Sequence, residues 1–180
     1  SIGTASRMPL VAGAPRPLLE GVASADYVAG SSDIVVVRRQ DGFTRLEVRG
    51  RTTLFETSGW ISHVRCSRDG RFVAFLHHLA IPDDRGDVML VGLAGEAPRV
   101  LSAGWISLTG LAWGPSGEEV WFTATGDSGS RTLRAVSREG KAREVYRMPG
   151  NLTLHDVSRA GLVLLAHDTM RIGASVSPPE

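Results

Sequence analysis

The tetrapeptide Gly-Trp-Ile-Ser occurs twice in this chain, at Gly59–Ser62 and again 45 residues later at Gly104–Ser107. A period of about 40–45 residues is the length of one four-stranded blade of a β-propeller. The repeat therefore predicts an array of similar blades. It constrains the fold more than any other feature of the sequence.

Short apolar runs rich in β-branched and aromatic residues dominate the chain, and helical periodicity is nearly absent. The clearest runs are residues 33–37, 71–76, 87–91, 119–123 and 162–165. Each has the length of a β-strand and is bounded by Gly, Ser, Asp or Pro. This spacing predicts an all-β sandwich, barrel or propeller, and the repeat favours the propeller.

A second pattern repeats four times: a short strand, a polar turn that contains Gly, and an apolar strand. Its copies are residues 27–36, 66–75, 113–122 and 157–164. Gly adopts positive φ at no steric cost, and Ser or Asp caps the backbone of the turn. We expect each copy to form the two inner strands of one blade.

Four glycines, spaced 38, 45 and 46 residues apart, mark the junctions between successive copies: Gly21, Gly59, Gly104 and Gly150. They divide the chain into about four blades, three complete and two partial. The predicted units are a partial blade at 1–20, blades at 21–58, 59–103 and 104–149, and a partial blade at 150–177.

Both ends of the predicted array stop in the middle of a blade. Outer strands are expected near 6–10 and 15–19, inner strands near 153–157 and 162–166, and a further strand near 171–176. Unpaired strands are a liability that proteins cover. The ends could close a four-bladed ring, pair between two chains in an eight-bladed ring, or continue into a longer polypeptide. We favour the last two, because larger rings are more usual for this kind of repeat. The absence of an initial methionine also suggests a processed piece of a longer chain.

The segment Ser67–Phe75 resembles the S-P-D-G-x-x-[IV]-A-F signature of TolB-like propeller repeats, and residues 113–122 resemble its W-S-P-D-G form. Residues 154–165 are similar to repeats found C-terminal to the kinase domain of some bacterial Ser/Thr protein kinases. The resemblance implies a WD-like sensor or protein-interaction region. Related repeats also form the gating propellers of prolyl-oligopeptidase-type enzymes. This chain departs from the pattern at Arg68, where Pro is usual, at Ala160, where Asp is usual, and in its irregular first copy.

The segment Gly126–Ser130, Gly-Asp-Ser-Gly-Ser, looks like the surroundings of a trypsin-type nucleophile. Such a site also needs a general-base His and an orienting Asp, and no plausible His segment precedes this one. The Gly-x-Ser-x-Gly elbow and the kinase motifs are absent as well. We therefore expect a flexible hairpin loop, no catalytic residues and no enzyme activity in this segment.

Two groups of polar residues could be ligands. His77 and His78, with Asp83, Asp84 and Asp87, contain the right donors for a metal, but solvated turn acids explain them better than convergent zinc ligands. The pair His155-Asp156 is expected to tie adjacent blades together rather than to contact a ligand. We predict no metal and no cofactor.

The four tryptophans, Trp60, Trp105, Trp113 and Trp121, could form an aromatic cage. Trp60 and Trp105 occupy equivalent positions in the repeat, so we expect them to pack at equivalent blade junctions. Burying such a ring contributes a few kcal/mol, roughly, to folding.

Composition excludes several classes of function. The net charge is +1 and the 22% of charged residues are dispersed, so no basic surface for nucleic acid is expected. No apolar run is long enough to span a membrane. Cys66 is the single cysteine, so no intrachain disulfide can form. A bacterial chain of this kind could be periplasmic or cytoplasmic, depending on its parent.

These observations predict a non-catalytic β-propeller that binds a protein or peptide, as the regulatory region of a bacterial signalling kinase. Two alternatives stay open. One is the gating propeller of a prolyl-oligopeptidase-type serine peptidase. The other is a structural unit that completes a ring with a second copy, as a homodimer.

Overall fold

The computed structural model describes residues 2–11, 13–48, 53–126 and 129–169. Within these ranges the chain is all-β and contains no helix. No segment among them could therefore cross a membrane as a helix. Its strands, in chain order, are β1 (Gly3–Arg7), β2 (Arg16–Tyr27), β3 (Ile34–Gln40), β4 (Phe43–Val48), β5 (Thr53–Thr57), β6 (Trp60–Cys66), β7 (Phe72–His78), β8 (Gly86–Gly92), β9 (Arg99–Trp105), β10 (Ser107–Trp113), β11 (Glu119–Thr125), β12 (Thr132–Ser137), β13 (Ala142–Tyr146), β14 (Asn151–Val157) and β15 (Val163–Asp168).

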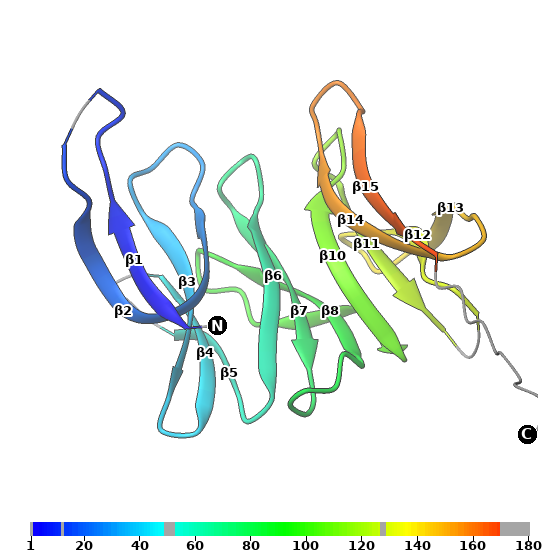
Figure 1. The fold of residues 1–180 in the computed structure, drawn as a ribbon, viewed down its shortest axis with the longest axis horizontal. Helices are drawn as coiled ribbons and strands as arrows, with labels where there is room; N and C mark the ends of the chain where they lie inside the picture. The colour runs from blue at the N-terminus through cyan, green and yellow to red at the C-terminus, as the bar shows by residue number, and fades with distance from the viewer. Residues whose placement is uncertain (1, 12, 49–52, 127–128, 170–180) are drawn as a thin grey trace, which may run out of the picture.

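The strands form four antiparallel sheets in which neighbours in sequence are neighbours in space. The sheets are β1 to β5, β6 to β9, β10 to β13, and the pair β14–β15. Figure 1 shows them side by side along the longest axis of the molecule, with β1 and β2 at one end and β14 and β15 at the other. The expected β-propeller fold is confirmed.

Each interface between sheets is a separate apolar core. Val35, Val37 and Leu46 of the first sheet pack against Val73 and Phe75 of the second. A second core joins the β6–β9 and β10–β13 sheets, and a third joins the latter to β14–β15. The alternation of faces along each strand explains this arrangement, because residues i and i+2 face one neighbour and residue i+1 faces the other.

The junction glycines are required by backbone geometry. Gly21, Gly104 and Gly150 have φ values of +73°, +80° and +92°, a region that L side chains rarely adopt. Gly59 has an ordinary φ, but a Cβ there would collide with the carbonyl oxygen of His78. All four glycines lie where the chain passes from an outer strand to the next inner one.

The N-terminal region differs in detail from the expected strands. The first strand is Gly3–Arg7 rather than residues 6–10. A single strand, Arg16–Tyr27, runs through the position where an outer strand was expected to end and an inner one to begin. Among the described residues, the two ends of the array do not pair with each other, since β1 and β15 belong to different sheets. The expected strand near 171–176 lies outside the described residues. The division into blades stays a prediction.

Candidate functional site

The turns between the first and second strands of successive sheets share one geometry. Gly70 N donates to Ser67 O at 3.0 Å, Gly117 N to Gly114 O at 3.0 Å, and Gly161 N to Ser158 O at 3.1 Å. In the β6–β7 turn, Ser67 Oγ donates to Asp69 Oδ1, which lowers the pKa of this carboxyl group. We name these the axial turns. They place polar side chains on one face of the molecule.

A polar cleft of about 250 Å³ lies between the axial turns of the second and third sheets. Its lining combines two arginines, two carboxylates and the backbone of a turn: Arg68, Asp69, Ser116, Gly117, Glu118 and Arg138. We name it the axial cleft. Arg138 comes from the β12–β13 turn and pairs with Asp69 at 3.7 Å and with Glu118, while its guanidinium lies 5.2 Å from the ring centroid of Phe72.

Arg68 connects three sheets. Its guanidinium donates to Pro115 O at 2.8 Å and to Val157 O at 3.0 Å, so an arginine on the β6–β7 turn reaches both following sheets. The usual Pro of this repeat has no side-chain donor and could make neither bond. The departure from the family pattern therefore adds a link between blades.

Replacing Arg68 with Lys is expected to destabilise the fold by about 1–2 kcal/mol, because one ammonium cannot span both carbonyls as the planar guanidinium does. Urea unfolding followed by tryptophan fluorescence measures the change. The exposed Arg71 is the matched control, and Arg71→Lys should shift the free energy of unfolding by no more than about 0.5 kcal/mol. Equal losses in the two variants would contradict the bridging role.

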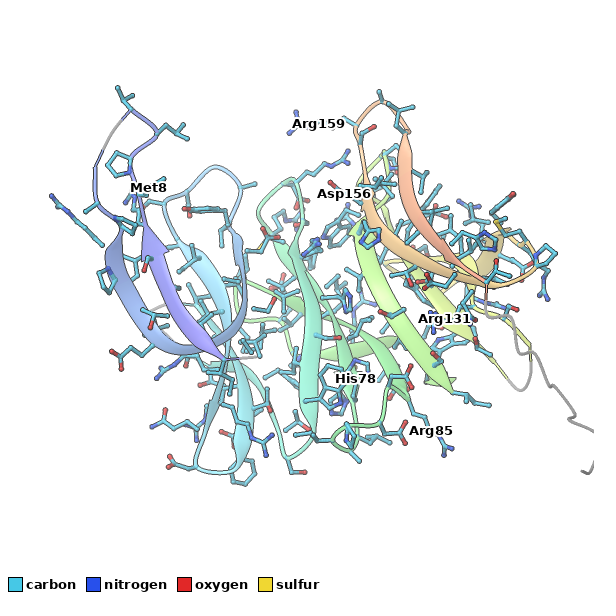
Figure 2. The ribbon with its side chains drawn as sticks, in the orientation of Figure 1. Met8, His78, Arg85, Arg131, Asp156 and Arg159 are labelled. Atoms are coloured by element: carbon cyan, nitrogen blue, oxygen red, sulfur yellow. The ribbon has the colours of Figure 1, made fainter. Side chains whose placement is uncertain are left out.

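A chain of hydrogen bonds crosses the second sheet from β6 to the β7–β8 loop. His63 Nδ1 lies 2.9 Å from Ser62 Oγ, which in turn lies 2.8 Å from His78 Nε2. The other ring nitrogen of His78, Nδ1, lies 3.2 Å from the carbonyl oxygen of Arg85. Since a carbonyl only accepts, His78 Nδ1 carries the proton and Nε2 accepts from Ser62. The Ser62 oxygen in turn accepts from His63. Figure 2 shows His78 and Arg85 at this end of the sheet.

The Ser62–His78 pair has the distance of a nucleophile and its base, but its surroundings do not suit catalysis. The Ser62 oxygen already accepts a hydrogen bond from His63. The His78 ring is fully buried and covered by Trp60, which stacks on it with centroids 3.9 Å apart. The arrangement fixes the β6 backbone, where His63 adopts a φ of +51° in a bulge.

Stability is expected to fall by about 2 kcal/mol as the pH drops from about 6.5 to about 4. Burial, helped by Arg65, His78 and His155, lowers the pKa of His63 to about 4. Its unfolded value is about 6.5, so the unfolded chain binds this proton first and gains stability as the pH falls. Because the His63 ring is partly exposed, the loss of stability is smaller than the free energy that corresponds to the full pKa shift.

Thermal unfolding between pH 4 and pH 7.5 tests this dependence. The control is His63→Asn, because Asn tolerates positive φ and does not titrate. The variant should lose a large part of the slope. An unchanged slope would assign the pH dependence to other groups, such as His77 and His78, whose pKa values burial also lowers.

The structure separates the candidate metal ligands. His77 contacts Thr57 Oγ1 at 2.9 Å, and His78 belongs to the chain described above. The three acids bind elsewhere: Asp83 accepts from Arg85 N, Asp84 from Ser107 Oγ and Asp87 from Gly104 N. Within the described ranges, no three His, Cys, Asp or Glu side chains converge on a common point.

The pair His155-Asp156 lies exposed on β14, where His155 occupies a bulge. The hydrogen bond of Asp156 goes to the backbone N–H of Val157 in the same strand. Figure 2 places Asp156 and Arg159 near the β14–β15 turn. The tie between blades that the sequence predicts for this pair is instead made by Arg131. Its Nε donates to Leu152 O at 3.2 Å, and its backbone N–H donates to Asn151 Oδ1 at 3.0 Å.

The remaining candidates are dispersed. Gly126, Gly129 and Ser130 lie in the loop between β11 and β12, and the residues between them lie outside the described ranges. The four tryptophan indoles donate to four different places: Trp60 to Ala80 O and Asp83 O, Trp105 to Ser102 Oγ, Trp113 to Arg65 O, and Trp121 to Glu119 Oε2. Trp105 packs in the core between two sheets, whereas Trp60 covers a histidine of its own sheet.

Comparison with known proteins assigns the chain to a family. A family model described as the lipoprotein LpqB beta-propeller domain (Gmad1) matches residues 44–172, more than two thirds of the chain. The chain belongs to this LpqB β-propeller family. A search of curated proteins gave no match.

Solved structures agree with the fold of this LpqB-type propeller. A structure from a study of two prolyl endopeptidases is 19% identical, with a TM-score of 0.59, over 78% of this chain and 25% of that one. A putative TolB from Agrobacterium tumefaciens is 12% identical, with a TM-score of 0.52, over 79% and 56%. An uncharacterized protein from Listeria monocytogenes EGD-e is 15% identical, with a TM-score of 0.51, over 79% and 50%.

The LpqB-type propeller thus spans a quarter to just over half of the length of these structures. At these identities the likeness shows the fold alone. It agrees with the propeller fold that the repeat containing Ser67–Phe75 predicts.

The sequence did not predict that Arg68 and Arg138 line a common cleft in this LpqB-type propeller. Arg68 replaces the usual Pro of the repeat, and this departure was the available signal. Arg138 lies in a Ser-Arg-Glu-Gly turn between outer strands. No local pattern places such a turn next to an axial turn of the preceding blade.

Proposed function

We propose that this chain is a non-catalytic β-propeller module that binds a protein or peptide partner at the axial cleft. The observation that carries the proposal is a polar cleft of about 250 Å³ that spans two sheets and is lined by both arginine and carboxylate side chains. Propeller domains of the LpqB and TolB type are generally non-catalytic. The Ser–His pair found among the described residues is blocked on both sides.

The cleft suits a short polar segment of polypeptide. Arg68 and Arg138 can offer donors to carbonyl or carboxylate oxygens, while Glu118 is exposed and can accept from peptide N–H groups or cations. Both arginines already contact a neighbouring sheet. A bound segment would therefore replace or supplement the contacts that these arginines make between blades. Binding would in this way change the packing of the blades, and an adjoining domain would respond to that change. In the parent protein we propose regulation of a bacterial signalling kinase as that output.

Selection of displayed peptides on the purified chain tests the proposal, with dissociation constants measured by fluorescence anisotropy. Ser116→Trp fills the cleft and should weaken the selected peptides at least tenfold. The matched control is Ala160→Trp, the same position of the next axial turn, outside the cleft; it should leave the affinity unchanged. Peptides that bind both variants as well as the natural chain would contradict the axial cleft as the site.

A second candidate is the gating propeller of a prolyl-oligopeptidase-type serine peptidase, which the likeness to a prolyl endopeptidase structure favours. The parent open reading frame distinguishes the two, through a hydrolase domain or a kinase domain. Hydrolysis of peptide or ester substrates by the purified chain, abolished by Ser128→Ala, would contradict the non-catalytic proposal itself.

A third candidate is an assembly function, in which the chain completes a ring with a second copy. Within residues 129–169, the sheet β14–β15 has two strands, whereas the sheet β10–β13 before it has four, and this difference favours the assembly function.

A further inference from the structure

The two ends of the array are incomplete in complementary ways. The sheets β6–β9 and β10–β13 have four strands each, whereas β14–β15 has two, and no other described strand pairs with β15. At the other end, the first sheet has five strands. Among the described strands, the C-terminal sheet has only an inner pair, and the N-terminal sheet carries an additional outer pair.

The additional pair is formed by β1 and the first half of β2. Residues 16–22 of β2 pair with β1, whereas residues 22–27 pair with β3. The change of partner follows Gly21, which has a φ of +73° like the glycines where other outer strands pass to inner ones. The geometry thus assigns β1 and Arg16–Val22 to the outer half of a preceding blade. The inner half of that blade is not among the described strands.

A cleft lies where the inner half would pack. It has a volume of about 200 Å³ and is lined mainly by small and apolar side chains of β1, β2 and the start of β3: Ala5, Ser6, Leu18, Ala25, Asp26, Tyr27 and Ile34. A second cleft of about 230 Å³ shares Leu18, Tyr27 and Ile34 with it. Tyr27 is 64% exposed at this site. Met8, labelled in Figure 2, is also exposed, beyond the end of β1.

The opposite end of the molecule presents a matching apolar residue. On β15, Val163 and Leu165 face the preceding sheet and pack on its core, so Leu164 faces away. Leu164 is 62% exposed. The corresponding residue of β7 is Ala74, which is fully buried against the following sheet. Leu164 therefore occupies the strand position through which the second sheet packs on the sheet that follows it.

We propose that the β14–β15 pair of a second copy occupies the cleft at β1 and β2. In this arrangement β15 of one copy pairs with the free edge of β1 of the other, and its Leu164 packs against Leu18, Tyr27 and Ile34. Each copy then contributes three complete blades and two halves, and two copies close a ring of eight, within the four to eight blades that propellers have. The inference rests on the assembly function and names its site.

Solution mass and a targeted cross-link test the inference on the full chain. Light scattering should give a dimer of about twice 19.2 kDa, and Leu164→Asp should raise its dissociation constant at least tenfold. The control is Leu79→Asp, which changes a leucine that is 71% exposed in the β7–β8 loop. It should leave the dimer intact. Circular dichroism on the same samples establishes that each variant is folded.

The cross-link identifies the surfaces. A Tyr27→Cys chain mixed with a Leu164→Cys chain should form a disulfide-linked dimer under mild oxidation, and neither chain alone should do so to the same extent. Cys66 is half-buried, and burial raises the pKa of its thiol to about 12, so it is a poor competitor.

The outcomes are distinguishable. A strictly monomeric chain at high concentration would overturn the second copy as occupant, and with it the assembly function. A dimer that is insensitive to Leu164→Asp and is not cross-linked would overturn the composite blade alone. Peptide binding at the axial cleft is measured separately, and Leu164→Asp should leave it unchanged.

Discussion

Gly110→Ala is expected to destabilise the protein by about 4 kcal/mol, enough to lower its melting temperature by roughly 8–16 °C. Gly110 lies in the bulge of β10 with a φ of +67°, and a Cβ there would collide with the carbonyl oxygen of Leu154 and lie 2.7 Å from its amide nitrogen. Both contacts are with backbone of the neighbouring inner strand β14. The strand cannot move away freely, because Leu154 N also donates to Thr123 Oγ1 at 3.2 Å.

Gly117→Ala separates the steric effect from the conformational one. Gly117 has a φ of +78°, similar to that of Gly110, but a Cβ there would meet nothing within 4 Å. Its substitution should therefore cost only the strain of a left-handed alanine, about 1 kcal/mol. Calorimetry of both variants measures the difference. If the two melting temperatures fell equally, the close approach of β10 and β14 would not be a source of stability.

The overall architecture could be predicted because its signals are local and repeated. Strand-length apolar runs, turns ending in glycine and the glycines at the blade junctions each reflect a backbone requirement that acts over a few residues. Gly104 illustrates this: its positive φ allows β9 to end and β10 to begin within two residues. A pattern of this kind is present in each copy of the repeat, and its recurrence in the other copies makes the prediction of the fold more specific.

The site could not be predicted in the same way, because it depends on contacts between blades. Arg68 reaches carbonyl oxygens 47 and 89 residues further along the chain. His77 and His78 are adjacent in the sequence, yet adjacent residues of a strand point to opposite faces. One histidine is consequently buried under Trp60 while the other contacts Thr57. The equivalence of Trp60 and Trp105 in the repeat did not give them the same packing either.

Phe122→Ala is expected to cost about 3–5 kcal/mol, because it removes a fully buried aromatic ring from the core between the second and third sheets. The ring packs edge-to-face on Trp105 with centroids 5.6 Å apart, so the loss includes this contact as well as a cavity. Phe122 belongs to β11 of the third sheet, whereas Trp105 belongs to β9 of the second sheet. The variant should therefore weaken the attachment of one sheet to another while leaving each sheet's hydrogen bonds intact.

Hydrogen exchange combined with chemical unfolding measures both consequences. The free energy of unfolding should fall in Phe122→Ala, and protection should decrease on both sides of the interface rather than in β11 alone. Phe43→Ala is the matched control, since this ring is 42% exposed at the start of β4 and its loss should cost less than about 1 kcal/mol. A loss of protection confined to β10–β13 would contradict the interpretation, because the stability of a stacked array lies in the cores between its blades as much as in the blades themselves.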